Sequence, residues 1–162
     1  MPLISDLIDN IGKKKVFMKM DLRWGYNNMR IKEKDDSKAA FSMPENVFEP
    51  TGIFFALTKS LVTFQAIMKN LLRNIIETED VVVFNDVVMV GIETEKGHDN
   101  IVEEVLRRMA ENNLFVKPEK CIWKVREVRF LRVVIEPDKV KIEKKKVQEV
   151  VNWLVLRSMK NM

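Results

Sequence analysis

Two aspartates interrupt apolar stretches of this sequence, and they are the side chains best suited to chemistry. Asp21 ends the apolar stretch that begins at Val16, and Asp86 lies inside the apolar segment 81–92. A buried, ionised carboxylate without a partner is costly, so Asp86 requires either a tight turn or a cation. Asn85 and Asp86 also suit a plain hairpin turn, because both side chains tolerate left-handed backbone. Spacing alone favours the turn.

The chemistry open to two such carboxylates is phosphoryl transfer. Acids brought together from separate strands can hold two magnesium ions, which activate an attacking 3′ hydroxyl and stabilise the leaving pyrophosphate. A turn at Asp86 accounts for that residue alone and does not explain why a second strand ends in Asp21. Because spacing does not place the two residues in contact, both interpretations stay open.

The elements that would position these residues follow from apolar periodicity. It predicts helices at 2–12, 61–77, 99–112 and 147–156, and strands at 16–21, 39–41, 81–92, 128–135 and 139–142. The segment 31–43 resembles a hairpin with a charged turn. This mixed order predicts an α+β fold in which helices cover an antiparallel sheet.

Composition limits the class of protein. The chain has 162 residues, a net charge of +4 and one cysteine, Cys121, which excludes an internal disulfide framework and a cysteine-cluster zinc site. No apolar run reaches the roughly 20 residues of a membrane span, and no signal peptide is recognisable, so an intracellular location, cytoplasm or nucleus, is expected. Basic clusters at 13–15 and 139–146 suit either a solvated face or phosphate contacts. His98 is expected on a polar surface.

Five stretches in a fixed order carry a resemblance to a known family. They are MDLRWGY at 20–26, FEP at 48–50 with FFALTKS at 54–60 and TFQ at 63–65, VFNDV at 83–87, NNLFVKPEKC at 112–121, and FL at 130–131. Together they resemble the motifs of reverse transcriptases from gypsy-type LTR retrotransposons. The resemblance implies a reverse-transcriptase palm, with an antiparallel sheet packed on helices, a partial fingers hairpin and no thumb.

The resemblance also implies a catalytic set for RNA-directed DNA polymerisation. Asp21 and Asp86 correspond to the ligands of Mg²⁺ (or Mn²⁺), and Lys120 corresponds to the lysine proposed to protonate the leaving pyrophosphate. Taken alone, Lys120 is one of many surface lysines. The implied partners are an RNA or DNA primer-template and, if the site is active, a dNTP.

Further residues receive binding roles from the same resemblance. Tyr26 corresponds to the side chain beneath the incoming sugar, and Phe55 to the nucleotide pocket. Lys38 falls near the template in the fingers, while Phe130 and Leu131 fall in the strand that grips the primer end. Taken alone, Tyr26 is better explained as a core aromatic, and the apolar pair needs no such role.

Departures from the family pattern are concentrated at functional and backbone-shaping positions. Val87 stands where the family has a second aspartate, and a valine offers no oxygen to a hard cation. Residues used for backbone shape are also replaced: Ala56 and Arg132 stand for glycines, Leu61, Leu154 and Leu156 for prolines, and Lys59 for an asparagine. These departures predict weakened metal binding and an impaired or inactive polymerase. The alternative is a non-catalytic, domesticated remnant that binds nucleic acid or protein.

The domain organisation expected from the resemblance is one unit, 1–162. Within it, about 27–60 is a fingers-side insertion, and 143–162 is the start of a connection to a missing thumb. The chain is also expected to lack the fingers strand that precedes the first catalytic aspartate. A palm without these neighbours exposes surfaces that could drive self-association, and ten methionines could line them. No membrane partner is expected.

Overall fold

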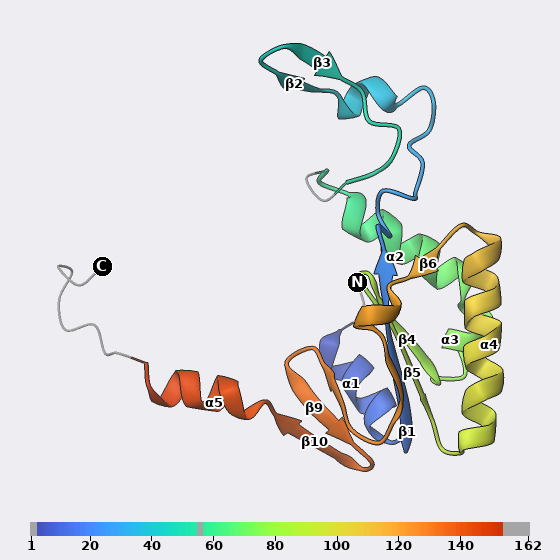
Figure 1. The fold of residues 1–162 in the computed structure, drawn as a ribbon, viewed down its shortest axis with the longest axis vertical. Coiled ribbons are helices and arrows are strands. Elements are labelled where there is room, and N and C mark those ends of the chain that lie inside the picture. The colour runs from blue at the N-terminus through green and yellow to red at the C-terminus, as the bar shows by residue number, and fades with distance from the viewer. Residues whose placement is uncertain (1–2, 55–56, 154–162) are drawn as a thin grey trace.

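An antiparallel sheet of five strands lies at the centre of the molecule (Figure 1). The computed structural model describes residues 3–54 and 57–153. The strands follow the order β4-β5-β1-β6, and β7 also pairs with β1. Their bounds are β1 (Val16–Arg23), β4 (Val81–Phe84), β5 (Val87–Ile92), β6 (Phe115–Val116) and β7 (Ile122–Val125). The predicted α+β class is confirmed.

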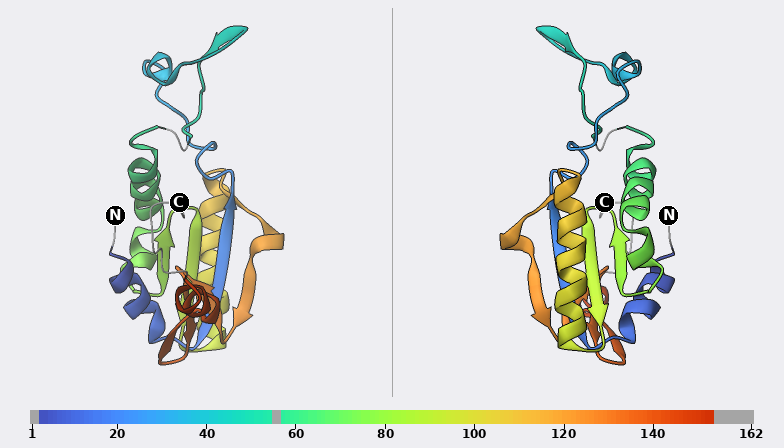
Figure 2. Two further views of the ribbon diagram at one scale, coloured as in Figure 1. Left: turned by 90° about the vertical axis from the view of Figure 1, so that its left-hand side faces the viewer. Right: turned by 90° about the vertical axis from the view of Figure 1, so that its right-hand side faces the viewer.

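Helices and a second sheet cover the two faces of this central sheet (Figures 1 and 2). One face packs against the helices α2 (Ser60–Leu71), α3 (Arg73–Ile76) and α4 (Glu95–Glu111). The other face packs against α1 (Ile4–Gly12) and against a three-stranded sheet of β8 (Val128–Phe130), β9 (Val133–Glu136) and β10 (Lys139–Ile142). The chain therefore has two apolar cores, one on each side of the central sheet.

Alternation along β1 decides which side chains enter which core. Met18, Met20 and Leu22 belong to the core with α2 and α4, and Phe17 belongs to the core with α1 and β8. Because successive side chains of a strand point to opposite faces, Asp21 shares the face of Phe17. Asp21 therefore faces the side of the molecule that carries β8 and β9.

A hairpin far from the central sheet forms the upper part of the molecule in Figure 1. It consists of β2 (Phe41–Met43) and β3 (Asn46–Phe48), preceded by the 3-10 helix η1 (Asp36–Ala39). The hairpin predicted at 31–43 is therefore wrong in its position: the charged turn continues through Ala39 as a 3-10 helix, and the strand predicted at 39–41 begins only at Phe41. The hairpin's aromatic side chains stack on each other and stay half exposed.

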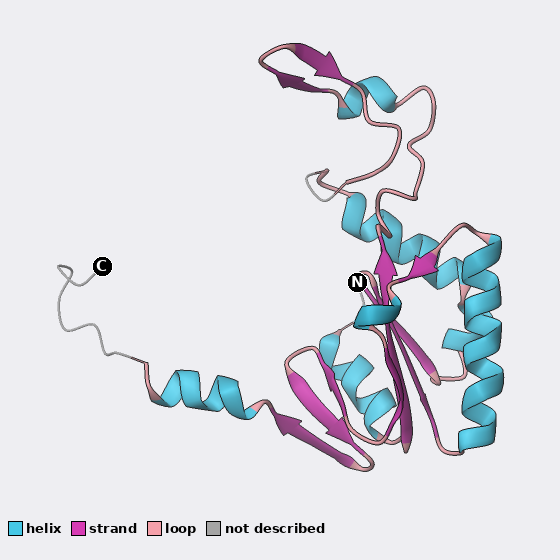
Figure 3. Cartoon of the chain, in the orientation of Figure 1, coloured by secondary structure: helices cyan, strands magenta, loops and turns pink. Residues whose placement is uncertain are grey.

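Other predicted elements also differ in their bounds (Figure 3). The helix predicted at 61–77 breaks at Leu72 into α2 and α3. The strand predicted at 128–135 is the hairpin β8–β9, because Leu131 and Arg132 have φ of 49° and 70°, which a strand cannot accommodate. The last helix, α5 (Lys144–Val151), begins before the predicted residue 147, and residues 154–156 lie outside the described residues.

Helix α4 starts earlier than predicted, with consequences for His98. Thr94 caps the helix by accepting a hydrogen bond from the Gly97 N–H on its hydroxyl, at 3.3 Å, so the first turn lies at 95–98. This places His98 inside the structure with a relative exposure of 2%. The prediction of a surface histidine is therefore wrong. Among the described residues, no helix has the length and apolar character to cross a membrane.

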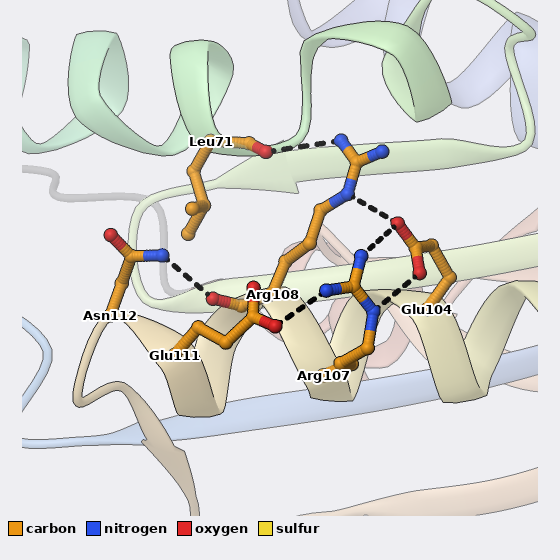
Figure 4. Close-up of polar contacts among 6 residues, drawn as sticks. All are labelled: Leu71, Glu104, Arg107, Arg108, Glu111 and Asn112. Carbon is orange, nitrogen blue, oxygen red and sulfur yellow. Dashed lines mark hydrogen bonds and ion pairs between the residues drawn. The ribbon is translucent and has the colours of Figure 1, made fainter.

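A cluster of charged side chains ties α4 to the break between α2 and α3 (Figure 4). The Arg108 guanidinium donates to the Leu71 carbonyl at 3.2 Å and to Glu104 at 2.7 Å. Arg107, on the solvent side, donates to Glu104 and Glu111. Arg108 thus satisfies a carbonyl at the end of α2 that the interrupted helix leaves without an intrahelical partner.

Candidate functional site

The two aspartates singled out by the sequence lie at the same edge of the central sheet. Asp21 on β1 stands opposite Val87 on β5 in the antiparallel register, and Asp86 is the residue next to Val87. The Leu22 N–H donates to the Asp86 carbonyl at 2.8 Å. The backbones of the two acids are therefore held side by side, although 65 residues separate them along the chain, the difference between 86 and 21.

Asp86 lies in the tight turn of the β4–β5 hairpin. Phe84 pairs with Val87, which leaves Asn85 and Asp86 as the two turn residues. Asn85 has a φ of 55°, in the left-handed region that asparagine tolerates. The hairpin-turn interpretation is therefore correct, and the turn also delivers the Asp86 backbone to Asp21. The two interpretations of Asp86 are compatible.

A lysine that the sequence did not single out faces Asp21. The Lys117 Nζ lies 3.6 Å from the Asp21 Oδ1, with both side chains about three-quarters buried. This Oδ1 atom is buried and accepts no hydrogen bond from the described residues. Lys120, which the resemblance points to as the general acid, is exposed at the end of the 3-10 helix η2 (Pro118–Lys120), and its backbone N–H donates to the Lys117 carbonyl at 2.9 Å. Its role stays a prediction.

Tyr26 is buried beside the site. Its relative exposure is 2%, and its ring centroid lies 4.6 Å from that of Phe64 on α2. Burial raises the pKa of the Tyr26 phenol, and the negative charge of Asp86 raises it further. Tyr26 is therefore a core aromatic that also lies within electrostatic reach of Asp86, and its hydroxyl stays protonated at neutral pH.

The two predicted primer-contacting residues meet the turn at a small cavity. The cavity, of about 220 Å³, is lined by Lys19, Phe84, Asn85, Asp86, Val87, Arg129, Phe130 and Leu131. Phe130 and Leu131 lie at the turn between β8 and β9, and Lys19 donates to the Arg129 carbonyl at 3.2 Å. The β8–β9 turn and the Asp86 turn thus line the same cavity.

Two other predicted residues are not brought to this place. Lys38 is exposed on η1, in the upper part of the molecule, and pairs with Asp35 at 2.5 Å. Phe55 lies outside the described residues. Neither position tests the roles that the resemblance implies.

Gln65 on α2 is a positioning residue that the sequence prediction did not include. Its amide Nε2 donates to the Val83 carbonyl at 2.7 Å, and its Oε1 accepts from the Asn85 N–H at 3.3 Å. The Gln65 side chain therefore binds two backbone groups, a carbonyl and an N–H, just before Asp86. Its place in the TFQ motif was the available signal, but sequence cannot show which backbone groups an amide will bind.

The donor set does not fit the pair of Mg²⁺ ions that the resemblance implies. Within the described ranges, no three His, Cys, Asp or Glu side chains come close enough to hold a metal ion together. Val87 presents methyl groups opposite Asp21, and the ammonium of Lys117 lies beside the same carboxylate. Hard divalent cations require oxygen ligands, so this set lacks one.

Comparison with known proteins identifies the class to which this fold and site belong. Residues 2–135 match the sequence profile of the reverse transcriptase family, described as RNA-dependent DNA polymerase. The chain belongs to this family.

The relatives are retrotransposon polyproteins. The chain is 28% identical over 153 residues to the retrovirus-related Pol polyprotein from transposon 297 of Drosophila melanogaster, covering 94% of this chain and 14% of that protein. It is 28% identical over 131 residues to the transposon Tf2-7 polyprotein of Schizosaccharomyces pombe, covering 81% of this chain and 10% of that one. The predicted resemblance to LTR retrotransposon reverse transcriptases is confirmed, and the chain spans a small part of these relatives' length.

Solved structures confirm the predicted fold. The foamy viral protease-reverse transcriptase in complex with an RNA/DNA hybrid aligns with a TM-score of 0.85 at 22% identity, covering 98% of this chain and 21% of that one. The same viral protein in complex with dsDNA aligns with a TM-score of 0.84 at 23% identity, covering 99% and 35%. The chain therefore has part of the reverse-transcriptase fold, with an antiparallel sheet packed against helices.

Proposed function

We propose that this chain is the palm and part of the fingers of a retrotransposon RNA-directed DNA polymerase whose nucleotidyl transfer is impaired or lost. The observation that carries the proposal is the cross-strand pair of Asp21 and Val87 beside the Asp86 turn. A carboxylate at position 87 would lie directly opposite Asp21, at the short distance of a cross-strand pair. The valine removes that oxygen donor and leaves divalent metal binding weak.

Nucleic acid is the substrate class we propose for the cavity beside Asp86. Its wall combines the cations Lys19 and Arg129 with the apolar side chains Phe130 and Leu131, which suits a phosphate backbone next to a sugar and base. The aligned viral enzyme is described in complex with an RNA/DNA hybrid and with dsDNA. We assign the primer end to this cavity, residues 27–60 to the fingers side, and residues 143–162 to the start of a connection toward a thumb.

The residues of this chain then have separate tasks. Gln65 keeps the Asp86 turn in place, and Tyr26 packs against Phe64 in the core nearby. Asp21 and Asp86 supply negative charge where a divalent ion would provide Lewis-acid chemistry. Lys120 remains the candidate proton donor, and Lys38 and Phe55 the candidate template and nucleotide contacts, all from the family resemblance.

The test is primer extension on an RNA template with Mg²⁺ or Mn²⁺. We expect the natural chain to extend the primer barely or not at all, and Val87→Asp to raise extension by roughly tenfold or more, the scale of losing or regaining one metal-site group. Asp21→Ala introduced into Val87→Asp should abolish the gain. If Val87→Asp gains nothing while binding primer-template normally, the assignment of the site is wrong.

A second candidate function is a non-catalytic remnant that binds nucleic acid through the old palm surface. It is favoured by the Lys117–Asp21 ion pair, which balances a catalytic carboxylate without a metal. This candidate predicts primer-template binding that is equal in EDTA and in Mg²⁺. Binding that requires Mg²⁺ would favour the polymerase instead.

A further inference from the structure

Lys117 contacts Asp21 through both its backbone and its side chain. The Lys117 N–H donates to the Asp21 carbonyl at 2.8 Å, immediately after the β6 pairing of Val116 with Leu22. The Lys117 carbonyl accepts from the Lys120 N–H at 2.9 Å and from the Cys121 thiol at 3.2 Å. The sheet and the following 3-10 turn therefore fix the backbone from which the ammonium reaches Asp21.

The ion pair lies in a sheltered place. The relative exposures of the Lys117 and Asp21 side chains are 24% and 23%, and their charged atoms are 3.6 Å apart. The Asp21 Oδ1 is buried and accepts no hydrogen bond from any described residue, so the ammonium is the charge that faces it. Partly buried pairs are screened by solvent much less than surface pairs.

The opposite side of Asp21 has lost its other charge. In the antiparallel register Asp21 and Val87 project on the same face of the sheet, and the valine is partly buried against the core that includes Phe17. The positive charge of Lys117 offsets the negative charge of Asp21, while Asp86 lies on the neighbouring turn. A divalent ion placed at Asp21 would meet a valine on the paired strand and a neighbouring ammonium.

We propose that Lys117 is a built-in cation that takes the place of a divalent metal ion at Asp21 and competes with one. Asp21 thereby has a counter-ion in the absence of metal, and the palm does not need a metal ion there for its stability. This proposal rests on the proposed function only in taking Asp21 as a former metal ligand. It assigns the weakness of metal binding to two causes that act together, the missing carboxylate at position 87 and the resident ammonium.

The test is Mn²⁺ binding, followed by the loss of the free-ion electron paramagnetic resonance signal. We expect the natural chain to show no saturable binding at about millimolar Mn²⁺, a concentration on the order of the Kd of weak sites for divalent ions. Lys117→Met should tighten binding by roughly tenfold or more, because it removes a like charge about one ion-pair distance from the metal. Val87→Asp combined with Lys117→Met should bind most tightly.

Lys120→Met is the matched control. It removes the same charge three positions along the same turn, from an exposed side chain without an ion pair among those recorded for the described residues. We expect Lys120→Met, like the natural chain, to show no saturable Mn²⁺ binding, because exposed charges are screened. Asp21→Asn added to Lys117→Met should remove the gained binding and so locate the ion at Asp21.

Thermal unfolding gives a second readout and guards against misfolding. In EDTA, Lys117→Met should lower the melting temperature relative to Lys120→Met, because Asp21 loses its counter-ion, and Mn²⁺ should restore it. If Lys117→Met does not fold, Lys117→Gln, which keeps a polar stem, replaces it in both measurements. The proposal is overturned if the Lys117 variants bind Mn²⁺ no better than Lys120→Met, or if the natural chain binds as tightly as the double variant.

These outcomes are independent of primer extension. A Val87→Asp palm that regains Mn²⁺ binding but never extends a primer would contradict the proposed role of the site in nucleotidyl transfer and leave the competition by Lys117 intact. A palm that extends primers after Val87→Asp would support the proposed function. If its Lys117 variants then bound Mn²⁺ no better than Lys120→Met, the competition by Lys117 would be contradicted.

Discussion

Outside the site, His98 is the one histidine of the chain. It is 2% exposed, and neither ring nitrogen has a hydrogen-bond partner among the described residues. Its Nδ1 lies 3.6 Å from the Asp99 carboxylate. Burial lowers the pKa of His98, and the attraction of Asp99 opposes this without reversing it. The folded protein therefore favours the neutral imidazole.

We predict a loss of stability at mildly acidic pH caused by His98. Because the folded pKa lies below the unfolded value of 6.5, the unfolded chain binds the proton more readily, so stability is full above pH 6.5 and falls as the pH drops toward the folded pKa. Urea midpoints at about pH 7.5 and about pH 5.5 measure the change. His98→Gln should remove most of the difference; an equal loss in both proteins would contradict the assignment.

Single residues also show which structural features the sequence predicts and which it cannot predict. The replacement of a family glycine by Arg132 was recognised from the motif, and its φ of 70° shows the backbone conformation that a glycine would suit. The burial of His98 could not be seen, because polar neighbours such as Asp99 and Asn100 suggested a surface. Lys117 was missed because an ion pair across the sheet depends on strand pairing, which spacing does not reveal.

At the scale of elements, the contact between α4 and the α2–α3 break depends on Arg108 (Figure 4). Arg108 is 24% exposed and donates to the Leu71 carbonyl, whereas Arg107 is 52% exposed and pairs only with carboxylates in the recorded bonds of the described residues. Arg107 and then Arg108 hold the pKa of Glu104 at about 2. The two arginines thus differ mainly in that Arg108 also donates a hydrogen bond to the Leu71 carbonyl.

We predict that Arg108→Met lowers the free energy of unfolding by about 1–2 kcal/mol, because it leaves the Leu71 carbonyl without its donor. Arg107→Met, the matched control on the same helix, should cost clearly less, because exposed ion pairs contribute little to stability. Urea denaturation followed by circular dichroism measures both. Equal losses would mean that the Leu71 contact contributes nothing of its own.

Element types were predictable where apolar periodicity was strong, as in the β4–β5 hairpin and α4. Breaks inside apolar runs could not be predicted from periodicity. The interruption at Leu72 is stabilised by Arg108 from a distant helix, and the β8–β9 turn uses Leu131, an apolar residue with a φ of 49°. In both places tertiary contacts override local preference.

At the scale of the whole molecule, a net charge of +4 and the cations around the Asp86 cavity predict salt-dependent binding to primer-template. The logarithm of the affinity should fall linearly with the logarithm of salt concentration, because phosphate contacts release counter-ions. Fluorescence anisotropy with a labelled RNA/DNA duplex measures the slope in EDTA and in Mg²⁺. A flat salt dependence, or no measurable binding, would count against nucleic acid as the partner.

The convergence of Asp21 and Asp86 is tested most directly by diffraction from crystals of Val87→Asp soaked in Mn²⁺, because the anomalous signal locates the ion. The account predicts a peak bonded to carboxylate oxygens of both aspartates at this edge of the sheet, and a much weaker peak in crystals of the natural chain. An ion that is absent from Val87→Asp, or that binds away from these two residues, would contradict it.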